Sequence, residues 1–398
     1  MNKNIYFILY KFKENSGSYA GVFEELSKRA STKGYNVTII CSKDSNKERD
    51  FEKLSYANLI RLNVEKSKMP IIASALDFIN FSSKVKRYLK KNKVSEEDII
   101  VVNSRAAIKL KDFNYILRMG QPAPVFLKNM NIAKEEISII SRMARYIHFN
   151  FLKYLEKICV KNAIALIYPS QETRNFAIQY YNNKDKSCLI WHSGINLKEI
   201  QNNKEIYSKG KYLLFISAGG EEKIRKGVIY LEKVLPDIFK EFKDVKLLHV
   251  GGQIDWNIPK EFQERIVSVG KVSWRDMPKY YNSSLFIISC SLNEGFPNTL
   301  LEAMAAGLPI ISSDIQGINE YIKNMEEGII YKRGDISELK KAIKTLLDNP
   351  NLIKSMSNKI KKRAKDFDYD NISNIIFKFF ESVSNKEITN TNLLERKN

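Results

Sequence analysis

Two glutamates, Glu294 and Glu302, stand on either side of a Gly-Phe-Pro turn, with seven residues between them. Carboxylates accept paired hydrogen bonds from vicinal hydroxyls, which suits the recognition of a sugar or a ribose. A helix that we expect to begin near Thr299 directs backbone N–H groups and the positive end of its dipole toward the same turn, and this favours an anion. The spacing therefore predicts that one carboxylate faces a sugar, the other faces a ribose, and a diphosphate lies between them.

A second segment supplies positive charge. Lys226 precedes Gly227 near the start of another expected helix. A single lysine at a helix start is also typical of a solvated surface charge, and Glu302 has a structural alternative as well. Residues 299–302 fit a capping box, in which the glutamate accepts a hydrogen bond from a backbone N–H at the helix start. Taken alone, the capping box is the stronger interpretation of Glu302, and only the residues around the pair of glutamates favour a ligand site.

These segments lie in an alternation of strands and helices. Apolar runs typical of strands cover residues 4–10, 36–41, 99–103, 115–118, 164–168, 188–191, 212–217, 246–250, 266–269, 285–290, 309–312 and 328–331. Helical patterns cover residues 19–33, 226–242, 275–282, 299–306, 336–348 and 369–383. Such alternation implies parallel sheets covered on both faces, with ligands at the carboxyl ends of the strands.

The length of 398 residues indicates two domains, because one hydrophobic core rarely organises so long a chain. A polar segment near 197–210 separates two runs of alternation. We expect an acceptor-binding domain at 1–196, a nucleotide-sugar-binding domain at 197–368, a C-terminal helix at 369–385 and a polar tail at 386–398. The ligand site of such a pair is expected in the cleft between the domains.

Composition narrows the class of protein. With 44% hydrophobic and 28% charged residues, the chain is typical of a globular protein. The cysteines stand alone, which argues against a disulfide framework or a zinc site and fits a reducing cytosol. Residues 1–200 hold 34 Lys and Arg against 19 Asp and Glu. This excess favours an anionic partner, and a general bias in composition is the open alternative.

The frame around the two glutamates resembles a family signature. Residues 294–302 read EGFPNTLLE and continue as AMAAGLPIISSDIQGINE, a pattern similar to that of the retaining glycosyltransferases of family 4, the group 1 glycosyltransferases of the GT-B fold. The resemblance extends over nearly the whole chain. It implies an α/β protein with two Rossmann-like, doubly wound parallel-sheet domains that face each other across a cleft, and a C-terminal helix that crosses back to the first domain.

The resemblance also implies roles for single residues. In the family, the first glutamate contacts the transferred sugar and the second contacts the nucleotide ribose. These roles fall on Glu294, as a catalytic residue, and on Glu302, as a donor-binding residue. A lysine that neutralises the donor diphosphate matches Lys226, the second catalytic residue.

The family's phosphate-binding arginine has no direct counterpart. Gly219 and Gly220 stand at its usual place, which leaves Arg225 or Lys223 as the second cation. Gly219, Gly220 and Arg225 are therefore counted among the donor-binding residues. The remaining expected donor contacts lie in the turn and the first helical residues: Gly295, Phe296, Pro297, Asn298, Thr299 and Leu300.

In the first half, the loop Ser16-Gly17-Ser18 resembles the family's glycine loop, where backbone N–H groups approach the donor or the acceptor. Glycine permits this approach, although short Gly/Ser loops after strands are common. Many members of the family carry a histidine near the reacting sugar. Gln121 follows the matching strand here, so we expect a hydrogen-bonding side chain without a catalytic role.

The motif Asp366-Phe-Asp368-Tyr-Asp370 superficially resembles a metal-binding DxD motif. No strand precedes it and an amphipathic helix follows, so helix capping is the preferred interpretation. We expect no metal and no cofactor besides the nucleotide-sugar co-substrate.

Two basic stretches, residues 84–93 and 142–157, resemble solvated or packed amphipathic helices. For residues 142–157, which also carry several aromatic side chains, the alternative is a contact with a membrane surface, and for residues 84–93 it is a contact with the acceptor or a membrane.

The predicted function is a retaining, metal-independent hexosyltransferase that uses a UDP- or GDP-sugar and a glycan or lipid-linked acceptor in cell-surface polysaccharide biosynthesis. The expected location is the cytoplasm or the inner face of the cell membrane. A sugar-nucleotide epimerase or a glycosyl phosphorylase of the same fold is the alternative. A basic nucleic-acid-binding protein ranks last, because no nucleic-acid-binding motif stands out.

Overall fold

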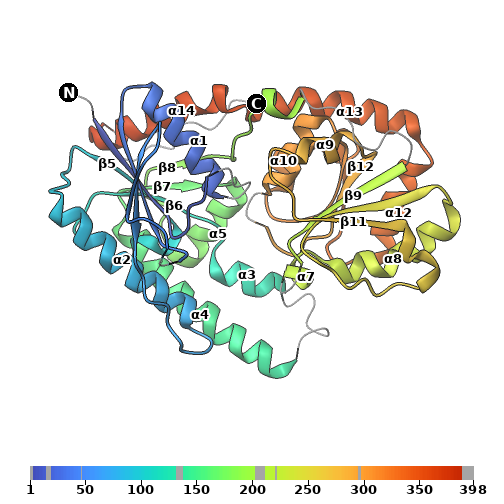
Figure 1. Ribbon diagram of the computed structural model, residues 1–398, viewed down its shortest axis with the longest axis horizontal. Coiled ribbons are helices and arrows are strands. Elements are labelled where there is room, and N and C mark those ends of the chain that lie inside the picture. The colour runs from blue at the N-terminus through green and yellow to red at the C-terminus, as the bar shows by residue number, and fades with distance from the viewer. Residues whose placement is uncertain are drawn as a thin grey trace. The chain divides into compact units, whose positions relative to one another are not determined.

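The computed structural model describes residues 3–14, 19–45, 47–130, 138–201, 211–219, 222–294 and 297–387. The chain folds into two compact α/β units (Figure 1). The first comprises residues 1–128, 134–192 and 371–398, and the second comprises residues 129–133 and 193–370. Each unit is built on its own sheet, in agreement with the predicted pair of doubly wound domains.

The first unit contains an eight-stranded sheet in the order β3-β4-β2-β1-β5-β6-β7-β8. Its strands are β1 (Asn4–Ile8), β2 (Asn36–Ser42), β3 (Phe51–Lys53), β4 (Asn58–Leu62), β5 (Ile99–Asn103), β6 (Ile116–Arg118), β7 (Ala165–Tyr168) and β8 (Cys188–Ile190). All pairings are parallel except that of β3 with β4. Strands β3 and β4 were not predicted, because β3 is a three-residue edge strand without buried residues and β4 buries little more.

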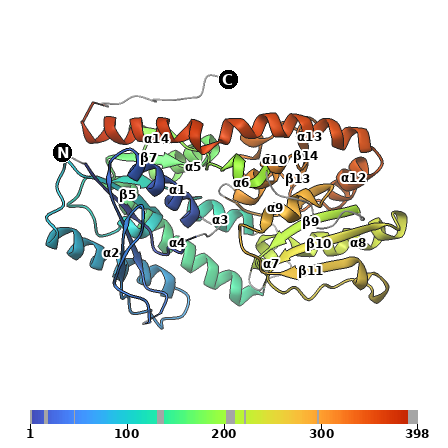
Figure 2. The same ribbon diagram turned by 45° about the horizontal axis from the view of Figure 1, so that its top comes forward.

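Helices cover both faces of this sheet (Figure 2). They are α1 (Tyr19–Thr32), α2 (Ala73–Lys91), α3 (Ala123–Met130), α4 (Ile139–Asn162), α5 (Gln171–Tyr181) and α14 (Tyr369–Ser384). On one face, Phe7 packs against Phe23 of α1 and Phe380 of α14, with ring centroids 5.6 and 6.5 Å apart. The next residue, Ile8, joins the core beneath α2, α4 and α5, because neighbouring side chains of a strand point to opposite faces. The C-terminal helix therefore packs on the first unit, as predicted.

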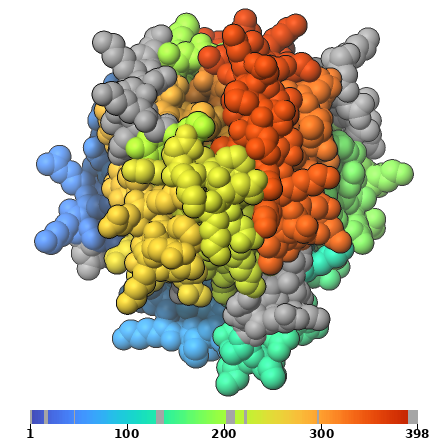
Figure 3. Space-filling model, turned by 90° about the vertical axis from the view of Figure 1, so that its right-hand side faces the viewer, coloured from blue at the N-terminus to red at the C-terminus, as the bar shows by residue number. Residues whose placement is uncertain are grey.

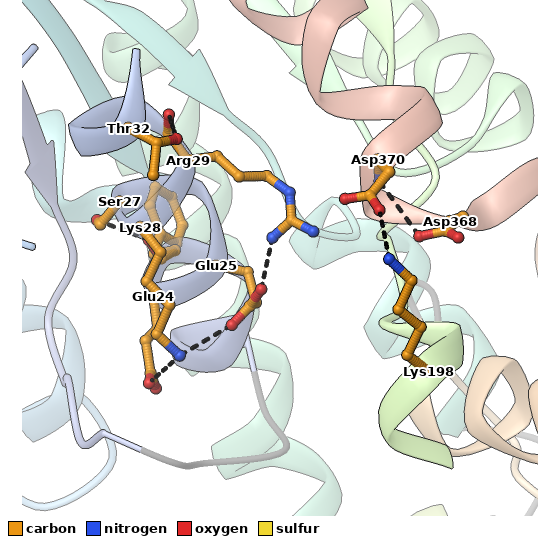
Figure 4. A network of polar contacts seen from close by, with 10 residues as sticks. Glu24, Glu25, Ser27, Lys28, Arg29, Thr32, Lys198, Asp368 and Asp370 are labelled. Atoms are coloured by element: carbon orange, nitrogen blue, oxygen red, sulfur yellow. Dashed lines mark hydrogen bonds and ion pairs between the residues drawn. The ribbon is translucent and has the colours of Figure 1, made fainter. Parts of the chain in front are cut away.

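Ion pairs run along α1 (Figure 4). The Nζ atom of Lys28 lies 2.9 Å from carboxylate oxygens of both Glu24 and Glu25, and Arg29 lies 2.6 Å from Glu25. Pairs three and four residues apart face each other on a helix and stabilise it. Glu24 and Glu25 thus stabilise α1, the helix that follows the predicted glycine loop, through ion pairs within that helix.

The second unit contains a six-stranded, fully parallel sheet in the order β11-β10-β9-β12-β13-β14. Its strands are β9 (Lys211–Ser217), β10 (Val245–Gly251), β11 (Ile266–Gly270), β12 (Phe286–Ser289), β13 (Ile310–Ser313) and β14 (Gly328–Tyr331). The chain order reverses between β9 and β12, as in a Rossmann sheet. Ligands of such sheets bind at the carboxyl ends of the strands that flank this reversal.

The helices of the second unit are α6 (Leu197–Gln201), α7 (Glu222–Arg225), α8 (Val228–Glu241), α9 (Met277–Asn282), α10 (Asn298–Ala306), α11 (Ile318–Tyr321), α12 (Ile336–Leu347) and α13 (Pro350–Ala364). Two cores lie on opposite faces of the sheet: α8 and α12 cover one, and α9, α10 and the end of α13 cover the other. Ion pairs join Lys340 to Asp237 and Lys344 to Glu241, so that α8 and α12 form one outer layer with α13 beside them (Figure 3).

The segment predicted as a polar linker is partly helical. Leu197 and Ile200 of α6 are buried in the core beside α10, because residues three apart share one face of a helix. Residues 202–210 lie outside the described part of the chain.

Candidate functional site

The carboxyl ends of β9 and β12, which are neighbours at the reversal of the second sheet, hold the predicted catalytic residues. Strand β9 leads through α7 to Lys226, and β12 leads to Glu294. A single edge of the sheet therefore receives the lysine and the first glutamate, although 67 residues separate them in the sequence.

Gly227 fixes the position of Lys226. Its φ is +67°, and a Cβ atom at this position would lie 2.0 Å from the carbonyl oxygen of Cys290. Only glycine lets this turn press so closely against the end of β12. The backbone N–H of Leu292 donates to the carbonyl of Arg225 at 2.8 Å and ties the two segments together. The Lys-Gly pair of the sequence thus has a structural reason.

Glu294 lies at the centre of a polar cluster. Its Oε1 atom is 2.7 Å from Nζ of Lys226 and 2.7 Å from a guanidinium nitrogen of Arg225. The hydroxyl of Ser291 donates to the same oxygen at 3.0 Å. The Arg225 guanidinium also donates to the backbone carbonyl of Asn293 at 3.1 Å. The structure therefore brings together both predicted catalytic residues and one of the two candidate second cations.

The charges of this cluster are partly shielded from water, with 12 to 19% of each charged side chain exposed. Burial alone would raise the pKa of Glu294. The opposite charges of Lys226 and Arg225 and the hydrogen bonds from Lys226 and Ser291 outweigh burial, and the pKa falls to about 2. Glu294 is consequently ionised at neutral pH, and together with its two cations the cluster carries one net positive charge.

The second glutamate has a different partner. Glu302 lies in the second turn of α10, where the hydroxyl of Tyr281 from α9 donates to its Oε2 atom at 2.7 Å. Burial raises the pKa of Glu302 to about 7, although the Tyr281 hydrogen bond acts in the opposite direction. Glu302 therefore changes its charge near neutral pH.

The capping box considered for Glu302 is absent. Helix α10 begins one residue earlier than expected, at Asn298, and its N-cap is Pro297, which has no side-chain capping bond. The first turn is closed by the N–H of Leu300, which donates to the carbonyl of Pro297 at 3.0 Å. The Leu300 side chain is buried in the core, so any contact of this residue with a donor would come from its backbone. Thr299 lies in the same first turn, and Gly295 and Phe296 lie outside the described residues.

Gly219 follows β9 with a φ of +72°, and a Cβ atom there would lie 2.5 Å from the carbonyl oxygen of Gln253. The loop after β10 lies so close to the backbone of Gly219 that a side chain at this position would clash with it. Lys223, the other candidate cation, pairs with Glu232 at 3.0 Å. Arg225 is thus the candidate that lies beside Lys226, whereas Gly220 lies outside the described residues.

The predicted acceptor residues lie in the first unit. Ser16, Gly17 and Ser18 fall outside the described part of the chain. Gln121 lies between β6 and α3, and both polar atoms of its amide are buried without a hydrogen-bond partner in the structure. The nearby N–H of Ala123 donates to the buried carboxylate of Glu156 at 2.9 Å. Gln121 is therefore held in a fixed segment with its hydrogen-bonding capacity unused.

The predicted absence of a metal stays a prediction. Within the described ranges, no group of three His, Cys, Asp or Glu side chains is placed to hold a metal ion. The N–H of Asp370 donates to the carboxylate of Asp368 at 3.2 Å at the start of α14, which agrees with the capping role expected for this motif. Lys198 lies 3.9 Å from Asp370 (Figure 4).

All four cysteines are buried and free. None of the helices in the described ranges combines the length and the apolar character that crossing a membrane requires.

Sequence reasoning missed two residues of this region. Ser291 lies three residues before Glu294, but a serine at a strand end carries no distinctive signal. Tyr281 lies 21 residues before its partner Glu302, on a different helix. Only the packing of α9 against α10 brings these two side chains together.

Residues 197–366 match the model of the family described as glycosyl transferases group 1. The chain is 25% identical over 232 residues to an uncharacterized glycosyltransferase of Methanocaldococcus jannaschii, an alignment that covers 58% of this chain and 63% of that relative. It is 23% identical over 280 residues to the O-antigen chain mannosyltransferase of Salmonella typhimurium, which covers 68% and 74% of the two chains. The chain thus spans less than two thirds of the length of the first relative.

Solved structures show the same fold. The sucrose-phosphate synthase of Thermosynechococcus elongatus superposes with a TM-score of 0.77 at 17% identity, over 97% of this chain and all of that one. The Anabaena protein HepE in complex with UDP-glucose superposes with a TM-score of 0.65 at 14% identity, over 95% and 99% of the two chains. The predicted GT-B fold is confirmed.

Proposed function

Because this chain carries a group 1 glycosyltransferase domain in residues 197–366, we propose that it transfers a sugar from a nucleotide-diphospho-sugar to a hydroxyl group of a glycan or lipid-linked acceptor. The observation that carries the proposal is the cluster of Arg225, Lys226 and Glu294 at the carboxyl ends of β9 and β12. This is the edge at which a Rossmann sheet binds its ligand.

The cluster has the charge that a diphosphate needs. Arg225, Lys226 and Glu294 together carry one net positive charge, which attracts an anionic ligand. Arginine presents a planar fork of donors to phosphate oxygens, and lysine acts as a point charge. In the proposed reaction, both neutralise the negative charge that develops on the leaving diphosphate.

Glu294 is proposed to bind the transferred sugar. With a pKa of about 2, it stays ionised and does not serve as a proton donor at neutral pH. An ionised carboxylate accepts hydrogen bonds from sugar hydroxyls while it holds Lys226 in place. Its role is therefore to orient the sugar relative to the two cations.

Glu302 is proposed to bind the ribose of the donor. Its Oε2 atom already accepts a bond from Tyr281, which fixes the carboxylate. When ionised, the remaining lone pairs can accept bonds from the two vicinal ribose hydroxyls.

The proposed reaction retains the configuration of the transferred hexose. The bond between the anomeric carbon and the donor phosphate oxygen breaks, and the acceptor oxygen bonds to the same face of that carbon. The acceptor proton passes to the leaving phosphate, so that no protein nucleophile takes part. We propose that the step needs neither a metal nor another cofactor.

A UDP- or GDP-sugar is the proposed donor, supported by a structure of this fold that holds UDP-glucose. A growing cell-surface polysaccharide is the proposed acceptor, supported by the likeness to an O-antigen chain mannosyltransferase and by the basic first half of the chain. The unused amide of Gln121 is the proposed hydrogen-bonding group for the acceptor. We propose that the protein acts in a reducing compartment, because its four cysteines are free.

The proposal is tested in two steps. A thermal-shift screen against UDP-, GDP-, ADP- and CMP-sugars identifies the donor, because a ligand of the native state raises the melting temperature. Transfer of the sugar from that donor is then measured for the wild type, for Glu294→Ala and for Glu264→Ala, an exposed control. We expect no transfer by Glu294→Ala and normal transfer by Glu264→Ala.

Full activity of Glu294→Ala would overturn the role of this residue. Conversion of the donor sugar without any acceptor would identify an epimerase, and a requirement for inorganic phosphate as co-substrate would identify a phosphorylase. Either result would overturn the proposed transfer.

A further inference from the structure

The two ends of α4 have different surroundings. Leu152, Leu155 and Cys159, toward the C-terminal end, are buried in the core of the first unit. Large apolar side chains elsewhere on the helix are 51 to 81% exposed, namely Ile139, Ile140, Met143, Tyr146, Ile147 and Tyr154. The N-terminal end of the helix is capped by Ser138, whose hydroxyl accepts a hydrogen bond from the N–H of Ser141 at 3.2 Å.

The exposed side chains form one stripe. At 100° per residue, the six side chains fall within an arc of about 120° around the helix. Leu152, Leu155 and Cys159 point in the opposite direction. The stripe therefore lies on the face of α4 that is turned away from the core, where a helix of a globular protein is ordinarily polar.

The charge around the stripe has one sign. No acidic residue occurs between Ser138 and Leu155, and at 100° per residue Arg142 and Lys153 border the stripe next to Tyr146. The surroundings of the stripe on its own helix are therefore basic.

A neighbouring loop has the same composition. Met69 and Ile71, which precede α2, are 54 and 46% exposed, and Lys66 and Lys68 beside them are exposed as well. A 2.7 Å hydrogen bond between Nδ1 of His148 and the carbonyl oxygen of Ile71 ties this loop to α4. By the same helical angles, His148 lies on the side of α4 that Leu155 and Cys159 occupy, so this loop packs beside the helix and is not part of the stripe.

The backbone of the loop is strained. Ile71 has a φ of +71°, a region that β-branched residues rarely adopt. The hydrogen bond to His148 is the contact that holds this residue to α4, and its side chain stays half exposed.

We propose that the exposed stripe of α4, with Arg142 and Lys153 beside it, docks the protein onto an anionic lipid bilayer. Apolar side chains that enter the headgroup region, flanked by Lys and Arg, are the pattern that binds such membranes. A second copy of the same basic surface would repel it, which disfavours a symmetric dimer through this face. The proposal goes beyond the proposed function, because it depends on neither the donor nor the acceptor.

Cosedimentation of the full chain with vesicles tests the proposal. We expect binding to phosphatidylcholine vesicles that contain about one third phosphatidylglycerol, weaker binding to pure phosphatidylcholine, and a decrease with added salt. Replacing two side chains of the stripe, in Ile140→Ser with Met143→Ser, should lower the partition coefficient about tenfold. Each charge removed by Arg142→Gln or Lys153→Gln should lower it about fivefold.

Matched controls lie on the second unit: Met325→Ser removes an exposed methionine and Lys354→Gln an exposed lysine. Both should bind vesicles as the wild type does. Equal losses in variants and controls would overturn the proposal, as would equal binding to both kinds of vesicle. A dimer in sedimentation equilibrium that the double serine variant dissociates would identify a second copy as the occupant instead.

Because Ile140 and Met143 are exposed, the double serine variant should keep the melting temperature of the wild type. Transfer to a water-soluble acceptor should also stay unchanged in the double serine variant. That measurement separates failure of the docking proposal from failure of the proposed function, which the Glu294→Ala assay tests.

Discussion

The loop that carries Glu294 and the helix that carries Glu302 place the same side chain in opposite electrostatic surroundings. Around Glu294, two cations and a hydroxyl outweigh burial and lower the pKa to about 2. Around Glu302, burial prevails over one tyrosine hydroxyl and raises the pKa to about 7. The spacing of the two residues in the sequence shows none of this, because their partners come from α7, α9 and the residues beside them.

The contrast separates the roles of the two residues. Glu294 is a constant negative charge that organises Arg225 and Lys226. Glu302 is a group whose charge follows the pH near neutrality. The effects on folding have opposite signs: the contribution of Glu294 is present above its unfolded pKa of 4.5 and is lost as pH falls toward 2, whereas that of Glu302 is present below 4.5 and is lost as pH rises through about 7.

After the complete loss of transfer expected for Glu294→Ala, the largest effect is expected at Lys226, the cation held against Glu294. Replacing it in Lys226→Met removes a positive charge from the leaving diphosphate and should lower kcat about 10²- to 10³-fold. Lys246→Met, at an exposed position of β10, is the control and should transfer sugar normally. An unchanged kcat in Lys226→Met would mean that the donor diphosphate does not bind at this cluster.

Arg225 should matter less, because its guanidinium also holds the carbonyl of Asn293. Arg225→Gln should weaken donor binding about tenfold, as expected for the loss of one charge-assisted hydrogen bond. The dissociation constant measured by calorimetry checks this. Arg225→Lys should recover part of the affinity, because it keeps the positive charge. Equal loss of affinity in both variants would mean that the planar shape of the guanidinium group, and not its charge, decides donor binding.

Glu302 should give donor binding a dependence on pH. If the ionised carboxylate binds the ribose, affinity for the nucleotide-sugar should rise up to about tenfold between pH 6 and pH 8, since a group of pKa about 7 loses its proton there. The diphosphate of a nucleotide-sugar does not titrate in this range. Glu302→Gln should bind more weakly and independently of pH, and a pH dependence that persists in this variant would assign the titration to another group.

The smallest effect is expected at Tyr281. Its hydroxyl bond lowers the pKa of Glu302, so Tyr281→Phe should move the midpoint of the pH dependence upward. Loss of one buried hydrogen bond should cost about 1 kcal/mol of unfolding free energy, measurable by urea denaturation. A midpoint that stays in place or moves downward would mean that the tyrosine has no influence on this carboxylate.

Much of the fold followed from the sequence. Strands such as β9 and β12 are continuous apolar runs, because parallel strands are buried on both faces. The edge strand β3 was not predicted, because its three residues have no buried side chains and therefore show no apolar pattern.

The site was only partly predictable. Glu294 and Lys226 carry local signals, a turn before a helix and a glycine after a lysine. The choice between Arg225 and Lys223 depended on the direction in which each side chain leaves the short helix α7, and Tyr281 depended on the packing of two helices. The sequence marked residues 142–157 as a candidate for membrane contact, but apolar residues occur on both faces of that helix, so only the structure shows which face is exposed.

The most direct test of a donor-phosphate site at Arg225, Lys226 and Glu294 is a calorimetric titration of the full chain with the nucleotide-sugar that the thermal-shift screen selects. The wild type should bind it, and the double variant Arg225→Gln with Lys226→Met should bind it about a hundredfold more weakly, because two charge-assisted contacts are lost. Binding of the double variant with the affinity of the wild type would contradict the account.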